Sequence, residues 1–90
     1  QEALQMNLVN RVVPAAELEK YTIDYATTMA NNAPLTLASV KASIIECLKD
    51  PAKRDLDRLQ KMVEACYKSE DYKEGQTAFM EKRKPMFKGR

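Results

Sequence analysis

Four prolines divide this 90-residue chain, and each stands where a helix can begin or has to end. Proline has a fixed φ that suits the first turn of a helix, but it lacks the amide hydrogen that a helix interior needs. Pro14 and Pro34 therefore predict helix starts. Asp50-Pro51 and Pro85 predict helix ends, because the residue before a proline is pushed out of the helical region. Since the chain has only two glycines, the pattern predicts a mainly helical protein.

The segments between the prolines carry apolar residues at helical spacing. We expect helices at residues 14–32, 34–50 and about 56–69, and the Asn31-Asn32 pair can end the first of them because asparagine tolerates a left-handed backbone. The apolar stripes are Leu18, Tyr21, Tyr25 and Met29; Leu37, Val40, Ile44 and Leu48; and Leu56, Leu59, Val63 and Tyr67. Each stripe is typical of an amphipathic helix that packs one face against a neighbour.

A fourth and more polar helix is expected from Tyr72 to about Lys84. Asp71 is its predicted N-cap, with Glu74 as the glutamate that reciprocates three residues later. On this helix Phe79 and Lys82 are three residues apart and would share one face. An aromatic ring beside an ammonium group suits a nucleotide, because a base can stack on the ring while lysine meets a phosphate. The alternative is a core aromatic near cations that favour a helix C-terminus.

The residues before Pro14 differ from the rest of the chain. Residues 2–6 read as the last turn of a helix, and LVNRVV at residues 8–13 has the β-branched content of a short strand. A single strand cannot satisfy its own backbone hydrogen bonds. We therefore expect a partner strand upstream of Gln1, and we divide the chain into residues 1–13, the end of an upstream core, and residues 14–90, a helical segment.

Several classes of site are excluded or disfavoured by the residues present. The chain has no histidine, and Cys47 and Cys66 lack the CxxC spacing, so we expect no metal, no serine triad and no Cys/His nucleophile. We interpret both cysteines as reduced core residues. Gly75 and Gly89 are isolated and form no phosphate-binding loop. No apolar run is long enough to span a membrane, and none reads as a secretory signal.

The acidic residues show no catalytic constellation. They occupy polar helix faces or first turns, and we interpret them as solvated surface groups: Glu17, Glu19, Glu46, Glu64, Glu70, Asp71, Glu74 and Glu81. General acid and base catalysis would need two carboxylates in a protected cleft with displaced pKa values. The net charge of +2 is too small to indicate a nucleic-acid partner, although cations gather near the end of the chain.

Three stretches resemble one known family. LVNRVVP, NNAPLTLASVK and SEDYKEGQTAFMEKRKPMFKGR occur in this order, and they are similar to the C-terminal third of enoyl-CoA hydratases, in the crotonase superfamily. The closing stretch is the most specific. One departure is Asn7, which stands where the family commonly has glycine before a leucine, but asparagine can adopt the same positive φ.

The resemblance implies a parent enzyme with an α/β crotonase-like fold, of which residues 14–90 would be the C-terminal helical region. The parent would act on acyl-CoA thioesters, with coenzyme A as part of the substrate and no tightly bound cofactor. Its catalytic glutamates and oxyanion-binding amides would lie upstream, so no residue here inherits a catalytic role. Phe79 and Lys82 match the aromatic residue and lysine that line the CoA nucleotide in that family.

The resemblance also implies partners and a place in the cell. The helices would supply contacts in a homotrimer or a dimer of trimers, and the parent would act in the cytoplasm or the mitochondrial matrix. Isolated, the 90-residue segment should be inactive. Two alternatives remain open at this point: a self-contained helical module that binds a partner protein, and a basic-tailed protein that binds nucleic acid weakly.

Overall fold

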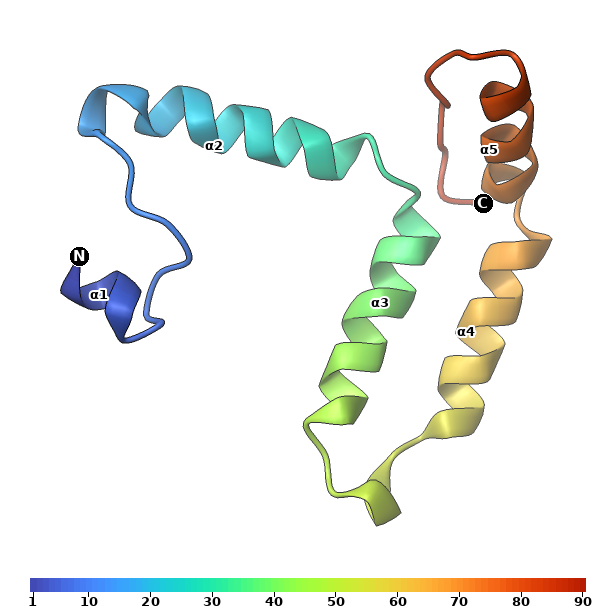
Figure 1. Cartoon of the computed structure of the whole chain (residues 1–90). Coiled ribbons are helices and arrows are strands. Elements are labelled where there is room, and N and C mark those ends of the chain that lie inside the picture. The colour runs from blue at the N-terminus through green and yellow to red at the C-terminus, as the bar shows by residue number, and fades with distance from the viewer.

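The protein is a succession of helices joined by short connections (Figure 1). The computed structural model describes all 90 residues and contains no β-strand. The elements in chain order are α1 (Glu2–Gln5), α2 (Ala15–Ala30), α3 (Pro34–Cys47), the 3-10 turn η1 (Pro51–Lys53), α4 (Leu56–Lys68) and α5 (Glu70–Met80). The prediction of a mainly helical chain is confirmed.

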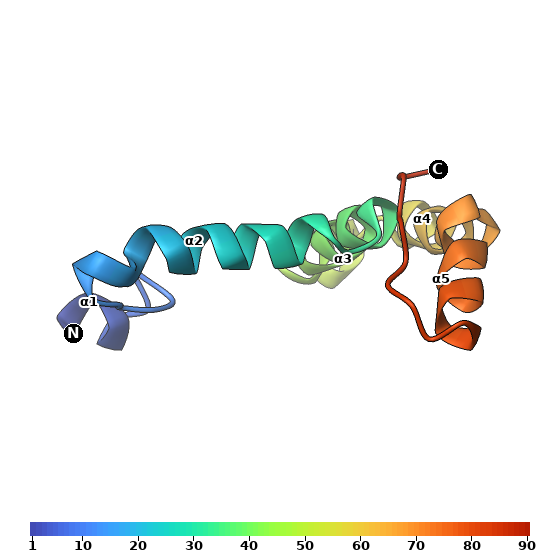
Figure 2. The same cartoon turned by 90° about the horizontal axis from the view of Figure 1, so that it is seen from above.

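The helices form an open, bent arrangement rather than a compact domain. α3 and α4 run side by side as a hairpin, while α2 extends away from the start of α3 (Figure 1). Seen from above, α2, α3 and α4 share one layer and α5 leaves it (Figure 2). The Cα radius of gyration is 17.2 Å, whereas a compact domain of this length has about 12 Å.

The predicted strand at residues 8–13 is wrong. These residues connect α1 to α2 in an irregular path, and the physical reason is that no second strand in these 90 residues offers a hydrogen-bonding partner. The turn before them does form. Asn7 has a φ of 55°, and the amide groups of Asn7 and Leu8 donate to the carbonyls of Leu4 and Ala3 at 3.1 and 2.8 Å. This is a Schellman cap, and it confirms the positive φ expected of Asn7.

Three of the four prolines mark helix boundaries as predicted, and Pro85 does not, because α5 ends at Met80. α2 begins after Pro14, α3 begins at Pro34, and the α3 helix has ended before Pro51. α2 also ends at Asn31, but this residue keeps a right-handed φ of −84°, so the left-handed cap expected there is wrong. The asparagine at position 32 instead donates its side-chain amide to the carbonyl of Thr28 at 2.8 Å.

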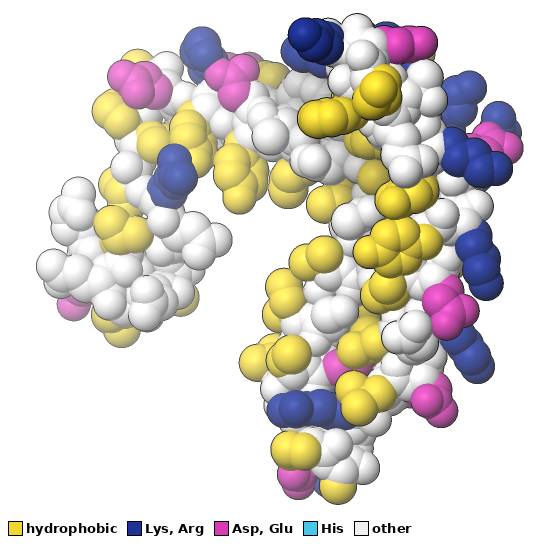
Figure 3. Space-filling view, turned by 45° about the vertical axis from the view of Figure 1, so that its right-hand side comes forward, with side chains coloured by type: hydrophobic (Ala, Val, Ile, Leu, Met, Phe, Trp, Pro, Cys, Tyr) yellow, Lys and Arg dark blue, Asp and Glu magenta, His cyan; other side chains and the backbone are white.

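The chain buries little of its own apolar surface. Only Ala42 and Ala78 are buried among the hydrophobic residues. The predicted stripes on α3 and α4 are instead largely open, with exposed fractions of 52% at Val40 and 84% at Leu48. In Figure 3 hydrophobic side chains cover the face shared by α3 and α4, while charged side chains gather along its outer edge. A face of this kind is suited to packing against further protein.

The cysteines do not lie in a core. Both are free thiols, but Cys47 is exposed and Cys66 is half-buried, so their interpretation as core residues is wrong. The reason is the same open packing that exposes the neighbouring stripe residues. As to membranes, none of the helices is both long enough and apolar enough to cross one.

Candidate functional site

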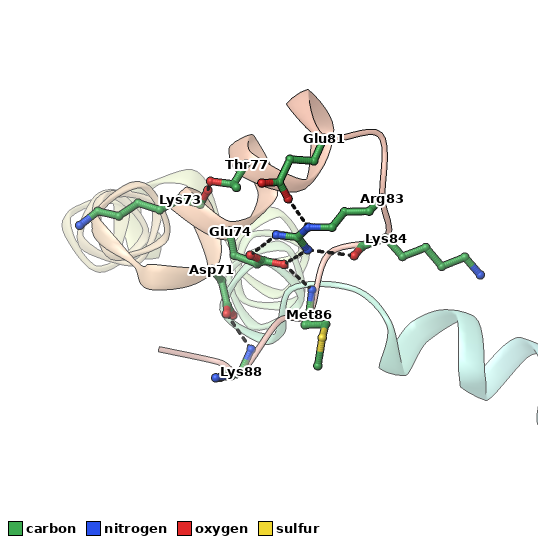
Figure 4. Close-up of polar contacts among 9 residues, drawn as sticks. All are labelled: Asp71, Lys73, Glu74, Thr77, Glu81, Arg83, Lys84, Met86 and Lys88. Atoms are coloured by element: carbon green, nitrogen blue, oxygen red, sulfur yellow. Dashed lines mark hydrogen bonds and ion pairs between the residues drawn. The ribbon is translucent and has the colours of Figure 1, made fainter.

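One face of α5 holds the end of the chain. The residues of this face are Asp71, Glu74, Gly75 and Ala78, spaced so that they fall on one side of the helix. Residues 83–90, which we call the tail, run back along this face, and the chain ends beside the start of α5 (Figures 1 and 4). We call the four α5 residues the anchor face.

Asp71 binds the far end of the tail. Its side-chain oxygens accept the amide hydrogens of Lys88 at 2.6 Å and Gly89 at 2.7 Å, and its own amide donates to the carbonyl of Arg90 at 3.1 Å. The residue is only 3% exposed. Its carboxylate also lies in the first turn of α5, where the helix dipole favours negative charge.

Asp71 is therefore not the N-cap of α5, nor a solvated surface acid. The cap is Ser69, whose hydroxyl oxygen accepts from the amide of Tyr72 at 3.0 Å. α5 consequently begins at Glu70 and not at Tyr72. The sequence was misleading because both serine and aspartate are good caps, and only the returning tail gives the aspartate another set of donors.

Glu74 binds the near end of the tail. Its two oxygens accept from the guanidinium of Arg83 at 2.6 and 2.9 Å, and one of them also accepts from the amide of Met86 at 2.8 Å (Figure 4). Arg83 contacts Glu81 as well. The Arg83 hydrogen bonds, followed by the Met86 amide, lower the pKa of Glu74 to about 2, and the two glutamates raise the pKa of Arg83.

The lowered pKa of Glu74 predicts a pH window for its contribution to stability. Between its usual value of 4.5 and about 2, the unfolded chain binds more protons than the folded one, so stability rises with pH there. At neutral pH we expect the free energy of unfolding of the complete wild-type protein to exceed that of its Glu74→Gln variant. The difference between the two should shrink as the pH falls through this window. Urea titrations at a series of pH values measure it. A difference that does not change with pH would contradict the assignment.

Gly75 lies against an aromatic ring of the tail. A Cβ at this position would lie 3.6 Å from the ring of Phe87, which is ordinary van der Waals contact. Phe87 therefore packs on this glycine, and an alanine would also fit there. Side chains of a helix lean toward its N-terminus, which would bring Phe79 toward Gly75, but the ring nearest to Gly75 is that of Phe87. Phe79 is instead 82% exposed.

Lys82 lies beyond the helix, at a left-handed turn. α5 ends at Met80 rather than near Lys84, and Lys82 has a φ of 54°. The amides of Lys82 and Arg83 donate to the carbonyls of Phe79 and Ala78 at 3.3 and 3.0 Å, which is a Schellman cap. Glycine is the usual residue at that position, and a residue with a Cβ costs about 1 kcal/mol there.

Phe79 and Lys82 thus occupy one end of α5 but do not share a regular helix face. Phe79 belongs to the last turn, and Lys82 forms the turn that follows. Both are exposed. Phe79 also borders an apolar groove whose walls come from α3, α4 and α5, including Val40, Ile44 and Tyr67. Phe79 lines this groove and Lys82 does not, and the assignment of the two residues to a ligand edge stays a prediction.

The remaining carboxylates form no acid and base pair. Glu46 is buried, contrary to expectation, and its oxygens accept from the ammonium of Lys49 at 2.6 Å and the amide of Asp55 at 3.0 Å. Lys49 and then Asp55 hold its pKa below the usual range. Glu46 therefore stays ionised and ties the end of α3 to the start of α4. Nowhere do three or more Asp, Glu or Cys side chains come together as a metal site would require.

Comparison with known proteins gives the family. The sequence model of the enoyl-CoA hydratase/isomerase family matches residues 1–90, and the chain belongs to that family. It is 40% identical over 91 residues to the methylmalonyl-CoA decarboxylase of Escherichia coli K12 and 37% identical over 94 residues to the carnitinyl-CoA dehydratase of Escherichia coli O157:H7. The resemblance seen in the sequence is confirmed.

Solved structures agree with this membership. An enoyl-CoA hydratase/isomerase from Mycobacterium paratuberculosis superposes with a TM-score of 0.83 at 28% identity, covering 100% of this chain and 36% of that one. An enoyl-CoA hydratase from Bacillus anthracis gives 0.75 at 34% identity, covering 100% and 35%. The two sequence relatives are covered to 35% and 36%. This chain therefore spans about a third of the length of the proteins it matches.

Proposed function

We propose that this chain is the C-terminal helical part of an enzyme that acts on acyl-CoA thioesters, of the hydratase or isomerase type, in fatty-acid or related metabolism. The family membership supports this, as do two relatives whose names specify CoA thioester substrates. The catalytic elements lie outside this chain, and coenzyme A is part of the substrate rather than a bound cofactor. The 90 residues alone are inactive.

Within that enzyme, Phe79 and Lys82 form the edge of the CoA site. The observation that carries this proposal is the 82% exposure of Phe79 beside a lysine in a left-handed turn. A large exposed ring gives an adenine base a stacking surface. A lysine kept at a position that favours glycine is typical of a functional constraint, since such backbone strain gathers at binding sites.

The open apolar faces have a second role in this proposal. The stripes of α3 and α4 pack against the rest of the enzyme and against neighbouring subunits of a trimer or a dimer of trimers. Their exposed fractions support this, because a helix with an unpartnered apolar face is stabilised chiefly by packing that face. A self-contained interaction module is less well supported, because it needs a core and this chain buries only Ala42 and Ala78.

The first test is the affinity of the complete protein for CoA after Phe79→Ala. Loss of the stacking surface should weaken CoA binding about tenfold, as base stacking contributes about 1–3 kcal/mol. Isothermal titration with CoA measures this. The matched control is Met86→Ala, which removes an apolar side chain of the tail that is 72% exposed and should leave the affinity unchanged. An unchanged CoA affinity in the Phe79→Ala variant would show that the Phe79 ring does not contact the coenzyme.

Lys82 is tested by comparing CoA with dephospho-CoA. If the ammonium meets the 3′-phosphate, Lys82→Ala should weaken CoA more than dephospho-CoA, because only CoA carries that group. Lys82→Gly is the control for strain: it removes the same ammonium but suits the left-handed turn. The two variants should lose the same affinity while Lys82→Gly is the more stable. Equal losses for both ligands would place Lys82 away from that phosphate.

A further inference from the structure

The tail is connected directly to the Lys82 turn. Arg83 follows Lys82, and its amide closes the cap on α5 by donating to the carbonyl of Ala78 at 3.0 Å. The guanidinium group of the same arginine donates two hydrogen bonds to the carboxylate oxygens of Glu74, at 2.6 and 2.9 Å. The residue that ends the turn is thus fixed at both its backbone and its side chain, and Figure 4 shows the side-chain contacts.

The rest of the tail is fixed at two more points. The Met86 amide binds Glu74, and the Lys88 and Gly89 amides bind Asp71. Beyond these, Gly89 lies close to the start of α3, where a Cβ on it would come within 3.4 Å of Pro34. The path of the tail after Lys82 is therefore fixed by two carboxylates, Asp71 and Glu74, which lie about one helical turn apart on α5.

We propose that Asp71 and Glu74 are positioning residues for CoA binding, which act by anchoring the tail and thereby fixing the left-handed turn that carries Lys82. The inference rests on the proposed binding role of Lys82. Neither carboxylate touches the coenzyme. Without the anchors, only the two backbone hydrogen bonds of the cap hold the strained turn, and a lysine gains nothing from φ near 54° by itself.

Phe79 supplies an internal comparison. It lies inside α5, whose start is capped by Ser69, so its place depends on the helix and not on the tail. A variant that releases the tail should therefore reduce the contribution of Lys82 to CoA affinity and leave the contribution of Phe79 to that affinity unchanged. A general loss of structure would reduce both contributions together.

The test is a pair of double-mutant cycles in the complete protein, read as the dissociation constant for CoA. Lys82→Ala should weaken binding about tenfold in the native background. In the Glu74→Gln background the same substitution should cost less than about twofold, whereas Phe79→Ala should cost about the same in both. Glu64→Gln is the matched control, because it removes a glutamate from an exposed pair with Lys68 on α4, away from the tail.

Two results would overturn the inference, and they distinguish failure of the positioning role of Glu74 from failure of the binding role of Lys82. If Lys82→Ala costs tenfold in both backgrounds, Lys82 binds CoA but Glu74 does not position it. If Lys82→Ala has no effect even in the native background, the binding role fails and the inference fails with it. Should Glu74→Gln not fold, Arg83→Gln breaks the same contact from its half-exposed side, and the same loss of coupling is expected.

Discussion

The 90-residue chain on its own is expected to unfold gradually, without a cooperative transition, and to associate at micromolar concentration. Cooperative unfolding needs a shared core, and the only buried apolar residues here are Ala42 and Ala78. Helices with exposed apolar faces tend to associate through these faces. Urea titration by far-ultraviolet circular dichroism measures the first property, and sedimentation velocity measures the second.

A polar variant of the α3 stripe provides the control. Ile44→Gln with Leu48→Gln should reduce association of the isolated chain, because both side chains are mostly exposed there. The same pair should destabilise the complete protein by about 2–5 kcal/mol, since each side chain would then be buried against further structure. A sharp two-state transition of the isolated monomer would contradict the account and favour a self-contained module.

Asp71→Ala should have the largest effect of any single substitution in the anchor face. Two hydrogen bonds to a charged acceptor are lost from a side chain that is 3% exposed. A loss of about 2–3 kcal/mol is expected in the complete protein, part of each bond being recovered when the freed amides meet water. Urea unfolding measures the loss, and proteolysis near residue 83 should increase because the tail is released.

Two other variants separate the role of Asp71 from general surface charge. Asp71→Asn keeps the shape but offers one acceptor oxygen for two amide donors, so it should fall between wild type and Asp71→Ala. Glu70→Ala removes only the exposed contact with Arg90 and should cost less than about 1 kcal/mol. If Asp71→Ala were as mild as Glu70→Ala, the tail would not depend on the buried carboxylate.

The starts of α2 and α3 and the end of α3 could be predicted because they depend on local chemistry. Proline acts on its own φ and on the residue before it, so Pro14, Pro34 and Pro51 indicated these three boundaries without any knowledge of packing. The strand at residues 8–13 could not be predicted this way, because its β-branched residues form a strand only if a partner is present.

The anchor face was missed for a related reason. Acidic residues near a helix start usually act as caps or as favourable charges for the dipole, and both explanations were sufficient for Asp71 and Glu74. What identifies their role is the tail, which returns from the other end of α5. A signal was present in the spacing of Asp71, Glu74, Gly75 and Ala78, which places two acceptors and two small residues on one face.

The closing stretch of the chain now has a physical explanation. Ser69 caps α5, the two carboxylates of the anchor face accept the tail amides, and Phe87 packs against Gly75. These residues of the closing stretch thus have partners elsewhere in it. Phe79 is 82% exposed and Lys82 sits in a left-handed turn, and these two observations support the proposal that they meet a ligand.

The most direct test is a crystal structure of the complete protein with bound CoA. We expect the adenine ring to contact Phe79 and the ammonium of Lys82 to lie within hydrogen-bonding distance of a phosphate oxygen. We also expect Lys82 to keep its positive φ and the tail to stay bound to Asp71 and Glu74. A coenzyme bound far from both side chains would contradict the central claim, even if the complete protein acts on acyl-CoA thioesters.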